Sequence, residues 1–162
     1  MKKWLVLSLA VIVLDQSTKQ LAENSLQLHE TVGVLPFLNI TLAYNTGAAF
    51  SFLSDASGWQ RWFFTVLALC VSIFLVVWMH RLESGQRHTA IALALILGGA
   101  LGNVWDRIML GYVIDFIDVF YSQWHWPAFN VADSAITIGA AILIVDALTG
   151  GRGNISDETS GN

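Results

Sequence analysis

Four long apolar segments constrain what this chain can fold into. They cover residues 4–22, 59–79, 89–110 and 131–148, and each has roughly the 20 residues that a helix needs to cross a bilayer core of about 30 Å. Of the 162 residues, 55% are hydrophobic and 12% are charged, whereas soluble domains are about 25% charged. We therefore predict an all-α membrane protein with four transmembrane helices, forming one domain over residues 1–149.

The first apolar segment has a second interpretation. Lys2 and Lys3 precede a run that resembles the core of a secretory signal peptide. No cleavage motif of small residues closes this run, and the helical spacing continues through Asp15 to Lys19. We therefore favour a first span that is retained in the protein.

The orientation of the spans follows from the basic residues in the short loops, which favour the cytoplasmic side. These residues are Lys2, Lys3, Arg81, Arg87 and Arg152. We predict that both termini are cytoplasmic and that residues 150–162, which are small and polar, form a disordered cytoplasmic tail. Residues 23–58 and 111–130 would then lie on the outer side.

The two outer segments carry interfacial and strand-like patterns. Tryptophan and tyrosine favour the membrane interface, and an outer belt would consist of Trp59, Trp62, Tyr121, Trp124 and Trp126. Apolar and smaller or polar residues alternate from Leu38 to Asn45, which is the period of a half-buried strand. We expect a small β element with a loop on the outer membrane surface.

Charge and cysteine content exclude several functions. The net charge is −4 and the eight Lys and Arg residues are scattered, so the basic face that nucleic acid requires is missing. The single cysteine, Cys70, lies in an apolar run and can form neither an internal disulfide nor a cysteine-based metal site. We expect Cys70 to pack inside the bundle.

Several polar residues lie inside the predicted spans, where they are costly and usually face protein or a water-filled cavity. Asp15 and Lys19 are four residues apart on one helix face and can neutralise each other. Asn103, Asp106 and Arg107 form a polar stripe on the third span. For both groups, a role in a functional site and a role in helix packing remain open. Before the stripe, the Gly98-x-x-x-Gly102 spacing allows close helix approach.

Three carboxylates lie in or beside the second outer segment. Asp115 and Asp118 are embedded in apolar sequence, and Asp133 stands at the predicted start of the fourth helix. Asp133 could simply cap that helix. Two carboxylates close together in a low-dielectric site cannot both ionise, so one keeps a proton and the pair can act as acid and base. Residue reasoning alone leaves open which of Asp115 and Asp118 would join Asp133.

Other catalytic arrangements are less well supported. A serine nucleophile needs a histidine base, but His29 and His125, the two outer histidines, are not paired by any helical spacing. A zinc ion could be held by His125 with the three carboxylates, yet nothing resembles a His-Glu-x-x-His helix. We expect no metal and no cofactor.

Five short motifs occur in order along the four predicted spans. They are Asp15-Gln16-Ser17-Thr18-Lys19, Asn45-Thr46-Gly47-Ala48-Ala49-Phe50, Gly102-Asn103-Val104-Trp105-Asp106-Arg107, Val113-Ile114-Asp115-Phe116 and Phe129-Asn130-Val131-Ala132-Asp133-Ser134. With them the chain resembles lipoprotein signal peptidase, the bacterial signal peptidase II family of membrane aspartyl peptidases. The resemblance covers nearly all of the chain except the tail.

The resemblance implies the site and the substrate. Asp115 and Asp133 would be the catalytic dyad, in a multi-pass protein of the bacterial inner membrane whose site faces outward. The substrate would be a prolipoprotein whose cysteine carries diacylglycerol, cut just before that cysteine. We also expect a monomer in contact with membrane lipid. Residues expected to bind the substrate or support the site are Asp15, Lys19, Asn45, Gly47, Ala48, Asn103, Asp106, Arg107, Asn130 and Ala132.

Two other functions remain as alternatives. A proton-coupled transporter or channel subunit would also place carboxylates inside spans. A membrane assembly factor could bind lipidated chains without cutting them. Proton flux through Asp15 in liposomes would favour the first, and an uncut complex with a lipidated precursor would favour the second.

Overall fold

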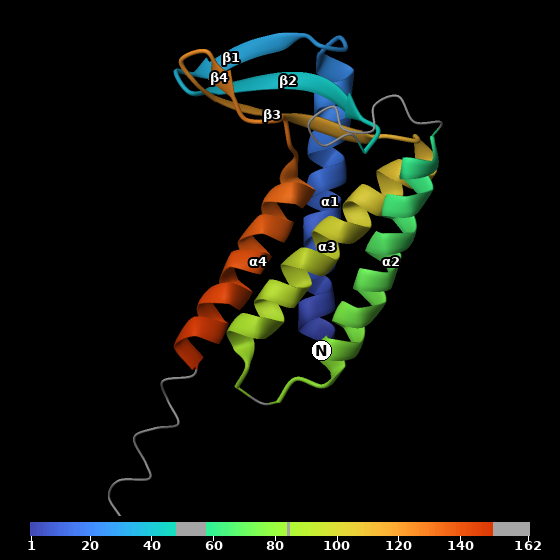
Figure 1. Cartoon of the computed structure of the whole chain (residues 1–162), viewed down its shortest axis with the longest axis vertical. Helices are drawn as coiled ribbons and strands as arrows, with labels where there is room; N and C mark the ends of the chain where they lie inside the picture. The colour runs from blue at the N-terminus through green and yellow to red at the C-terminus, as the bar shows by residue number, and fades with distance from the viewer. Residues whose placement is uncertain (48–57, 84, 151–162) are drawn as a thin grey trace, which may run out of the picture.

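A four-stranded antiparallel sheet lies across one end of a bundle of four long helices (Figure 1). This computed structural model describes residues 1–47, 58–83 and 85–150. The elements, in chain order, are α1 (Lys2–Ser25), β1 (Thr31–Leu35), β2 (Leu38–Asn45), α2 (Trp59–His80), α3 (Arg87–Met109), β3 (Val113–Tyr121), β4 (Trp124–His125) and α4 (Val131–Gly150).

The four predicted spans are confirmed as helices. Their ends differ from the prediction by at most three residues, and all four are long and apolar enough to cross a membrane. Their outward faces carry exposed apolar side chains, as expected for helices that face lipid. Cys70 is among the exposed residues, so the expectation that it packs inside the bundle is wrong. The run around it is apolar on every face, and sequence alone does not say which face meets lipid.

The most buried helix of the bundle is α3, and small residues on two of its faces allow close packing. A Cβ on Gly98 would lie 2.7 Å from the carbonyl oxygen of Ser8 in α1. A Cβ on Gly102 would lie 2.7 Å from Asp15 Oδ2, also in α1. Gly99 lies against the backbone of Ala132 in α4. The close approach predicted from the Gly98-x-x-x-Gly102 spacing is therefore confirmed, with α1 as the partner.

The sheet has the strand order β1-β2-β3-β4. Strand β2 covers Leu38–Asn45, as the alternation predicted, but β1, β3 and β4 were not predicted. The segment from Val113 to Tyr121 was expected to be loop. It forms a nine-residue strand whose first four residues are all buried, because both faces of this part of β3 are covered. A strand buried on both faces lacks the alternation that identifies a half-buried one.

The ends of the bundle differ in character. The aromatic residues of the predicted outer belt are exposed, and those on β3 and β4 belong to the sheet. The N-terminus and the end of α4 both lie at the opposite end of the bundle (Figure 1). There, Thr89 Oγ1 donates to Asp146 Oδ2 at 2.6 Å. Ala48 and the tail residues 151–162 lie outside the described residues.

Candidate active site

The path of β3 brings Asp115 to the start of α4. Asp115 is only 3% exposed and pairs in register with Ala43 of β2. Two residues on, Ile117 N–H donates to Phe129 O at 2.8 Å, and Phe129 N–H donates to Ile117 O at 3.0 Å. Since Phe129 immediately precedes Asn130, these two bonds hold the entrance of α4 against the strand. The first turn of α4, with Asp133, is thereby fixed beside Asp115.

Asn130 and Asp133 cap α4 reciprocally. Asp133 N–H donates to Asn130 Oδ1 at 2.9 Å, and Asn130 N–H donates to Asp133 Oδ2 at 3.3 Å. This is the pattern of a capping box, with Asn130 before the helix and Asp133 in its first turn. The N-cap of α4 is thus Asn130 and not Asp133, which takes part in the capping box only through Oδ2. The second oxygen, Oδ1, is available to the site.

Three asparagine amides connect the two carboxylates. Asn130 Nδ2 donates to Asp115 Oδ1 at 2.7 Å, and Asn103 Nδ2 donates to Asp133 Oδ1 at 2.8 Å. Asn45 Nδ2 donates to Asp115 Oδ2 at 3.0 Å. The three amides come from the entrance of α4, from α3 and from β2. The structure therefore brings the sequence-predicted residues together around Asp115 and Asp133.

Burial changes the acid–base behaviour of Asp115. Loss of solvent raises its pKa to about 7, and the nearby charge of Asp133 acts in the same direction. The hydrogen bonds from Asn45 and Asn130 and the charge of Lys19 oppose this shift. Two carboxylates coupled in this way titrate as a pair. Near neutral pH the pair can hold one proton, which is the charge state that acid–base chemistry requires.

A buried charged cluster lies beneath the carboxylates. Lys19 Nζ lies 2.8 Å from Asp15 Oδ2, 2.8 Å from Asp106 Oδ2 and 2.8 Å from Asn103 Oδ1. The side chains of Lys19, Asp15 and Asp106 are at most 1% exposed. The predicted pair between Asp15 and Lys19 is confirmed, and Asp106 is its third member. Through Asn103 two successive hydrogen bonds connect the cluster to Asp133.

The same cluster joins four elements. Asp15 Oδ1 accepts a hydrogen bond from Ala132 N–H in α4 at 2.9 Å. Asp106 Oδ2 accepts one from Ile114 N–H in β3 at 3.3 Å. Gln16 Nε2 in α1 donates to Asp106 Oδ1 at 2.7 Å. Sequence reasoning did not select Gln16, although an uncharged polar residue next to Asp15 inside a span was the available signal.

Arg107 and Gly47 border the same region. Arg107 interacts electrostatically with Asp133 and Asp115, and its guanidinium lies 5.6 Å from the centre of the Phe64 ring. Gly47 has a φ of +102°, and a Cβ there would lie 2.9 Å from that ring. Any other residue at position 47 would be strained and would displace Phe64. Small size therefore matters at position 47 for a structural reason.

The structure separates Asp118 from the other two carboxylates. Asp118 Oδ2 accepts a hydrogen bond from Asn39 Nδ2 at 2.8 Å, and Asp118 Oδ1 lies 2.9 Å from His125 Nδ1. The imidazole of His125 stacks on Phe120. The alternative of a zinc site between His125 and the three carboxylates gains no support. Within residues 1–47, 58–83 and 85–150, no group of three or more His, Cys, Asp or Glu side chains is arranged to hold a metal ion.

Two mainly apolar grooves meet at Asp133. One has a volume of about 300 Å³ and lies between α2, α3 and α4. The other has a volume of about 460 Å³ and follows α4 beside the end of β4. Besides Asp133, the first is lined by Phe64, Leu67, Ala68, Val71, Ile96, Ala100, Asn103, Arg107 and Ile136, and the second by Trp126, Phe129, Ser134, Thr137 and Ile138.

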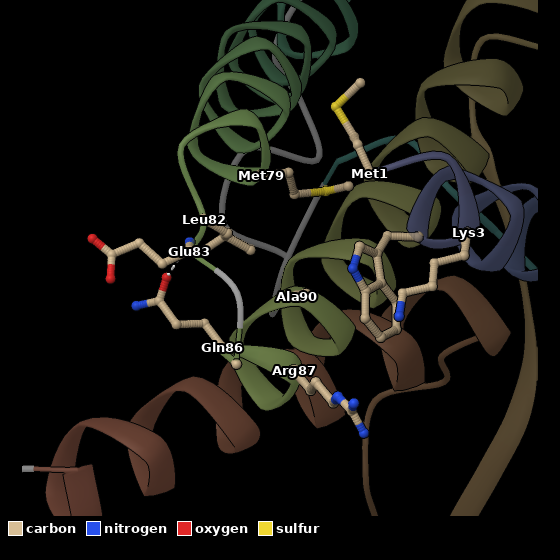
Figure 2. A pocket seen from close by; sticks show the side chains of 10 residues that line it. Met1, Lys3, Met79, Leu82, Glu83, Gln86, Arg87 and Ala90 are labelled. Carbon is tan, nitrogen blue, oxygen red and sulfur yellow. Dashed lines mark hydrogen bonds between the residues drawn. The ribbon is translucent and has the colours of Figure 1, made fainter.

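A further pocket, of about 380 Å³, lies at the opposite end of the bundle. Figure 2 shows Lys3 and Arg87 at its rim, with Glu83 directed away from both. Glu83 is the one carboxylate among the described residues that line this pocket. The pocket at that end therefore offers no carboxylate pair. The paired carboxylates lie at the end of the bundle that the sheet covers.

Comparisons with known proteins agree on one family. Residues 7–149 match the family model described as signal peptidase (SPase) II. The chain is 54% identical over 145 residues to the lipoprotein signal peptidase of Ectopseudomonas mendocina, covering 88% of this chain and 86% of the relative. It is 59% identical over 143 residues to that of Acinetobacter baumannii, covering 88% and 81%.

A solved structure supports the same assignment. A bacterial membrane enzyme determined by the in meso method at 2.3 Å resolution superposes with a TM-score of 0.85 at 31% identity. The match covers 98% of this chain and 94% of that one. The resemblance inferred from the five motifs is confirmed by these matches, and the chain is a peptidase that belongs to the signal peptidase II family.

Proposed function

We propose that this protein removes the signal peptide from prolipoproteins whose cysteine carries diacylglycerol, with Asp115 and Asp133 as the catalytic dyad. The observation that carries the proposal is the pair of coupled carboxylates held by Asn130, Asn103 and Asn45 where two apolar grooves meet. Membership of a family whose relatives are named lipoprotein signal peptidase gives the substrate class. The cut would fall just before the lipid-bearing cysteine.

The dyad would work without a covalent intermediate. Asp133, as the carboxylate, takes a proton from a water molecule, and the water oxygen attacks the scissile carbonyl carbon. Asp115, as the neutral acid, donates a hydrogen bond to the carbonyl oxygen and stabilises the tetrahedral intermediate. Asp133 then returns its proton to the leaving nitrogen as the C–N bond breaks. The pKa of about 7 for Asp115 supports its assignment as the proton-carrying partner.

The grooves fit a substrate with a helical and a lipid part. The groove between α2, α3 and α4 runs inside the span region and would take the apolar signal-peptide helix. The groove along α4 near Trp126 and Phe129 would take the acyl chains. Asp133 lines both, which would place the scissile bond beside the dyad. One chain supplies all these residues, so a monomer suffices.

A cleavage assay tests the substrate and the chemistry together. Purified protein in detergent is incubated with a diacylglyceryl-modified precursor, with the unmodified precursor, and with the modified precursor plus chelator. We expect two fragments from the modified precursor, with and without chelator, and mass spectrometry should place the new N-terminus at the lipidated cysteine. An uncut complex would support the assembly-factor alternative. Loss of cleavage with chelator would contradict a dyad acting on water alone.

We also propose that the sheet and the dyad lie on the outer side of the membrane, with both termini in the cytoplasm. Arg81 directly follows α2 and Arg87 begins α3, and the connection between these helices lies at the end of the bundle opposite the sheet (Figure 1). These basic residues support the orientation. In a Cys70→Ala background, Gln123→Cys should react with a membrane-impermeant maleimide on cells whose outer membrane is permeabilised. Gln86→Cys should react only after lysis. The reverse labelling pattern would overturn the orientation.

A further inference from the structure

The contacts of Asn103 connect the buried lysine to the dyad. Its Oδ1 accepts from Lys19 Nζ at 2.8 Å and from Asn130 Nδ2 at 3.3 Å, while its Nδ2 donates to Asp133 Oδ1 at 2.8 Å. Asn103 is 6% exposed, so water does not compete freely for these contacts. Each end of the amide therefore has a defined partner.

The chemistry of these partners fixes the direction of the amide. An ammonium group has only hydrogen-bond donors, so Lys19 can bond only to the oxygen end of Asn103. The NH₂ end must then point to Asp133. An ionised carboxylate has only acceptors, whereas a protonated one can also donate. An amide N–H directed at a carboxylate favours its ionised form. Asp115 also accepts two amide bonds, but it is buried whereas Asp133 is half-buried, so loss of solvent opposes ionisation more strongly at Asp115.

We propose that Lys19 is a positioning residue of the dyad: by holding the oxygen of Asn103 it presents the amide N–H to Asp133 and so makes Asp133 the ionised member. The proposal rests on the proposed function, because it assigns the two roles within that dyad. Asp15 and Asp106, by their contacts of 2.8 Å with Lys19, hold the ammonium in place. Lys19 thus acts through Asn103 and needs no contact with substrate.

The other charged groups around the dyad are few among the described residues. Asp15 and Lys19 approach from α1, Asp106 and Arg107 from α3, and Asp115 from β3. Arg61 of α2 donates to the carbonyl of Ile108. The charge of Lys19 also lowers the pKa of Asp115, so it favours ionisation of the pair by its field as well as through Asn103. Arg107 has the same sign, but its Nη1 donates to the backbone carbonyl oxygen of Asn103 at 3.3 Å, whereas Lys19 bonds to the side-chain Oδ1.

The test compares two variants that differ only at position 19. Asp106→Asn is the reference, and Lys19→Met combined with Asp106→Asn removes one charge of each sign, so the cluster keeps the net charge it has in the native protein. Asp15 retains its bond from Ala132 N–H in both variants. Cleavage of the diacylglyceryl-modified precursor is measured against pH. The rise of activity on the acidic side reports the first ionisation of the pair.

Loss of Lys19 should move this acidic limb upward relative to the native protein, whose cluster has the same net charge, by about one to two pH units, the size of one hydrogen bond to a charged group. The shift relative to Asp106→Asn should be larger, because that variant has one positive charge more. Lys19→Arg with Asp106→Asn should return the limb toward the reference, because a guanidinium also has only donors. Thr89→Val removes a partly buried hydrogen bond at the far end of the bundle. It should lower thermal stability and leave the limb in place.

A second variant keeps the proposal testable if the double variant does not fold. Asn103→Leu retains Lys19 and its two carboxylates but removes the N–H that faces Asp133. It should shift the acidic limb in the same direction, and the combined shift should be smaller than the sum of the two, since both variants break the contact with Asp133 and only the field of Lys19 is separate. Additive shifts, or an acidic limb at the same pH in all folded variants, would overturn the role of Lys19. Activity of Asp133→Asn would instead overturn the dyad itself.

Discussion

Replacing Asn130 by Ala should affect both the chemistry and the stability of the protein. Asn130 is fully buried, and its Nδ2 donates to Asp115 Oδ1 at 2.7 Å and to the carbonyl of Ile114 at 3.1 Å. Its Oδ1 caps α4 by accepting from Asp133 N–H at 2.9 Å. Alanine removes these three contacts and the bond of 3.3 Å from Nδ2 to Asn103 Oδ1, and leaves the carboxyl of Asp115 with Asn45 as its remaining amide donor.

The magnitudes follow from these contacts. A hydrogen bond between neutral groups contributes about 0.5–1.5 kcal/mol, and about 1.4 kcal/mol corresponds to tenfold in rate. If the bond from Asn130 orients the neutral acid Asp115 in the transition state, kcat should fall roughly 2- to 12-fold. Loss of the helix cap should lower the free energy of unfolding by a further ~1 kcal/mol. Because the bond from Asn130 lowers the pKa of Asp115, the alkaline limb of the pH–rate profile should also move to higher pH.

Cleavage of a diacylglyceryl-modified precursor, followed by gel shift across a pH series, measures both effects. The matched control is Asn39→Ala, which removes an equivalent amide-to-carboxylate bond of 2.8 Å at Asp118 in the same sheet. This control should lose stability and keep its rate and pH profile. A normal rate in the Asn130 variant, or an equal loss of rate in both variants, would refute the positioning of Asp115 by Asn130.

Other predictions follow from the same structure. In the wild-type enzyme, activity should fall as the pH rises through about 7, because Asp115 then loses the proton it donates. An elevated pKa in the folded state also means that stability falls as the pH rises from about 4 to 7, and thermal unfolding of Asp115→Asn should lack this component. Gly98→Ala should lower the unfolding temperature, since its Cβ would meet a backbone oxygen of α1 at 2.7 Å. Gly33→Ala, whose Cβ would have its nearest neighbour at 3.6 Å, should not, and equal unfolding temperatures for the two variants would contradict the packing argument.

The elements of the fold that could be predicted are those whose sequence pattern is local. The four helices were predictable from the length of apolar runs, and β2 from alternation between Leu38 and Asn45. Strand β3 was missed because its first half is buried on both faces. Its position between β2 and β4, in contact with α1 and α3, is a tertiary property, and the same apolar run could have been a loop or a helix end.

In the site, too, only the contacts with a local sequence signal could be predicted. The spacing of four residues predicted the contact between Asp15 and Lys19, but the third member, Asp106, comes from another helix 87 residues after Lys19 and has no local signal. The residue pattern alone also did not distinguish Asp115 from Asp118 as the partner of Asp133. The motif resemblance chose Asp115, which stays a prediction. In the structure Asp118 is bound to Asn39 and His125, while Asp115 is bound to Asn45 and Asn130.

The central claim is that Asp115 and Asp133 together activate water. The most direct measurement is the single-turnover rate of precursor cleavage by Asp115→Asn, Asp133→Asn and Asp118→Asn, each shown to be folded by its thermal unfolding curve. Asp118 is a buried carboxylate of the same strand with its own partners, so it controls for loss of charge in the sheet. We predict no detectable cleavage by the first two variants and a rate near wild type for the third. Cleavage by either of the first two, or equal loss in all three, would contradict the dyad.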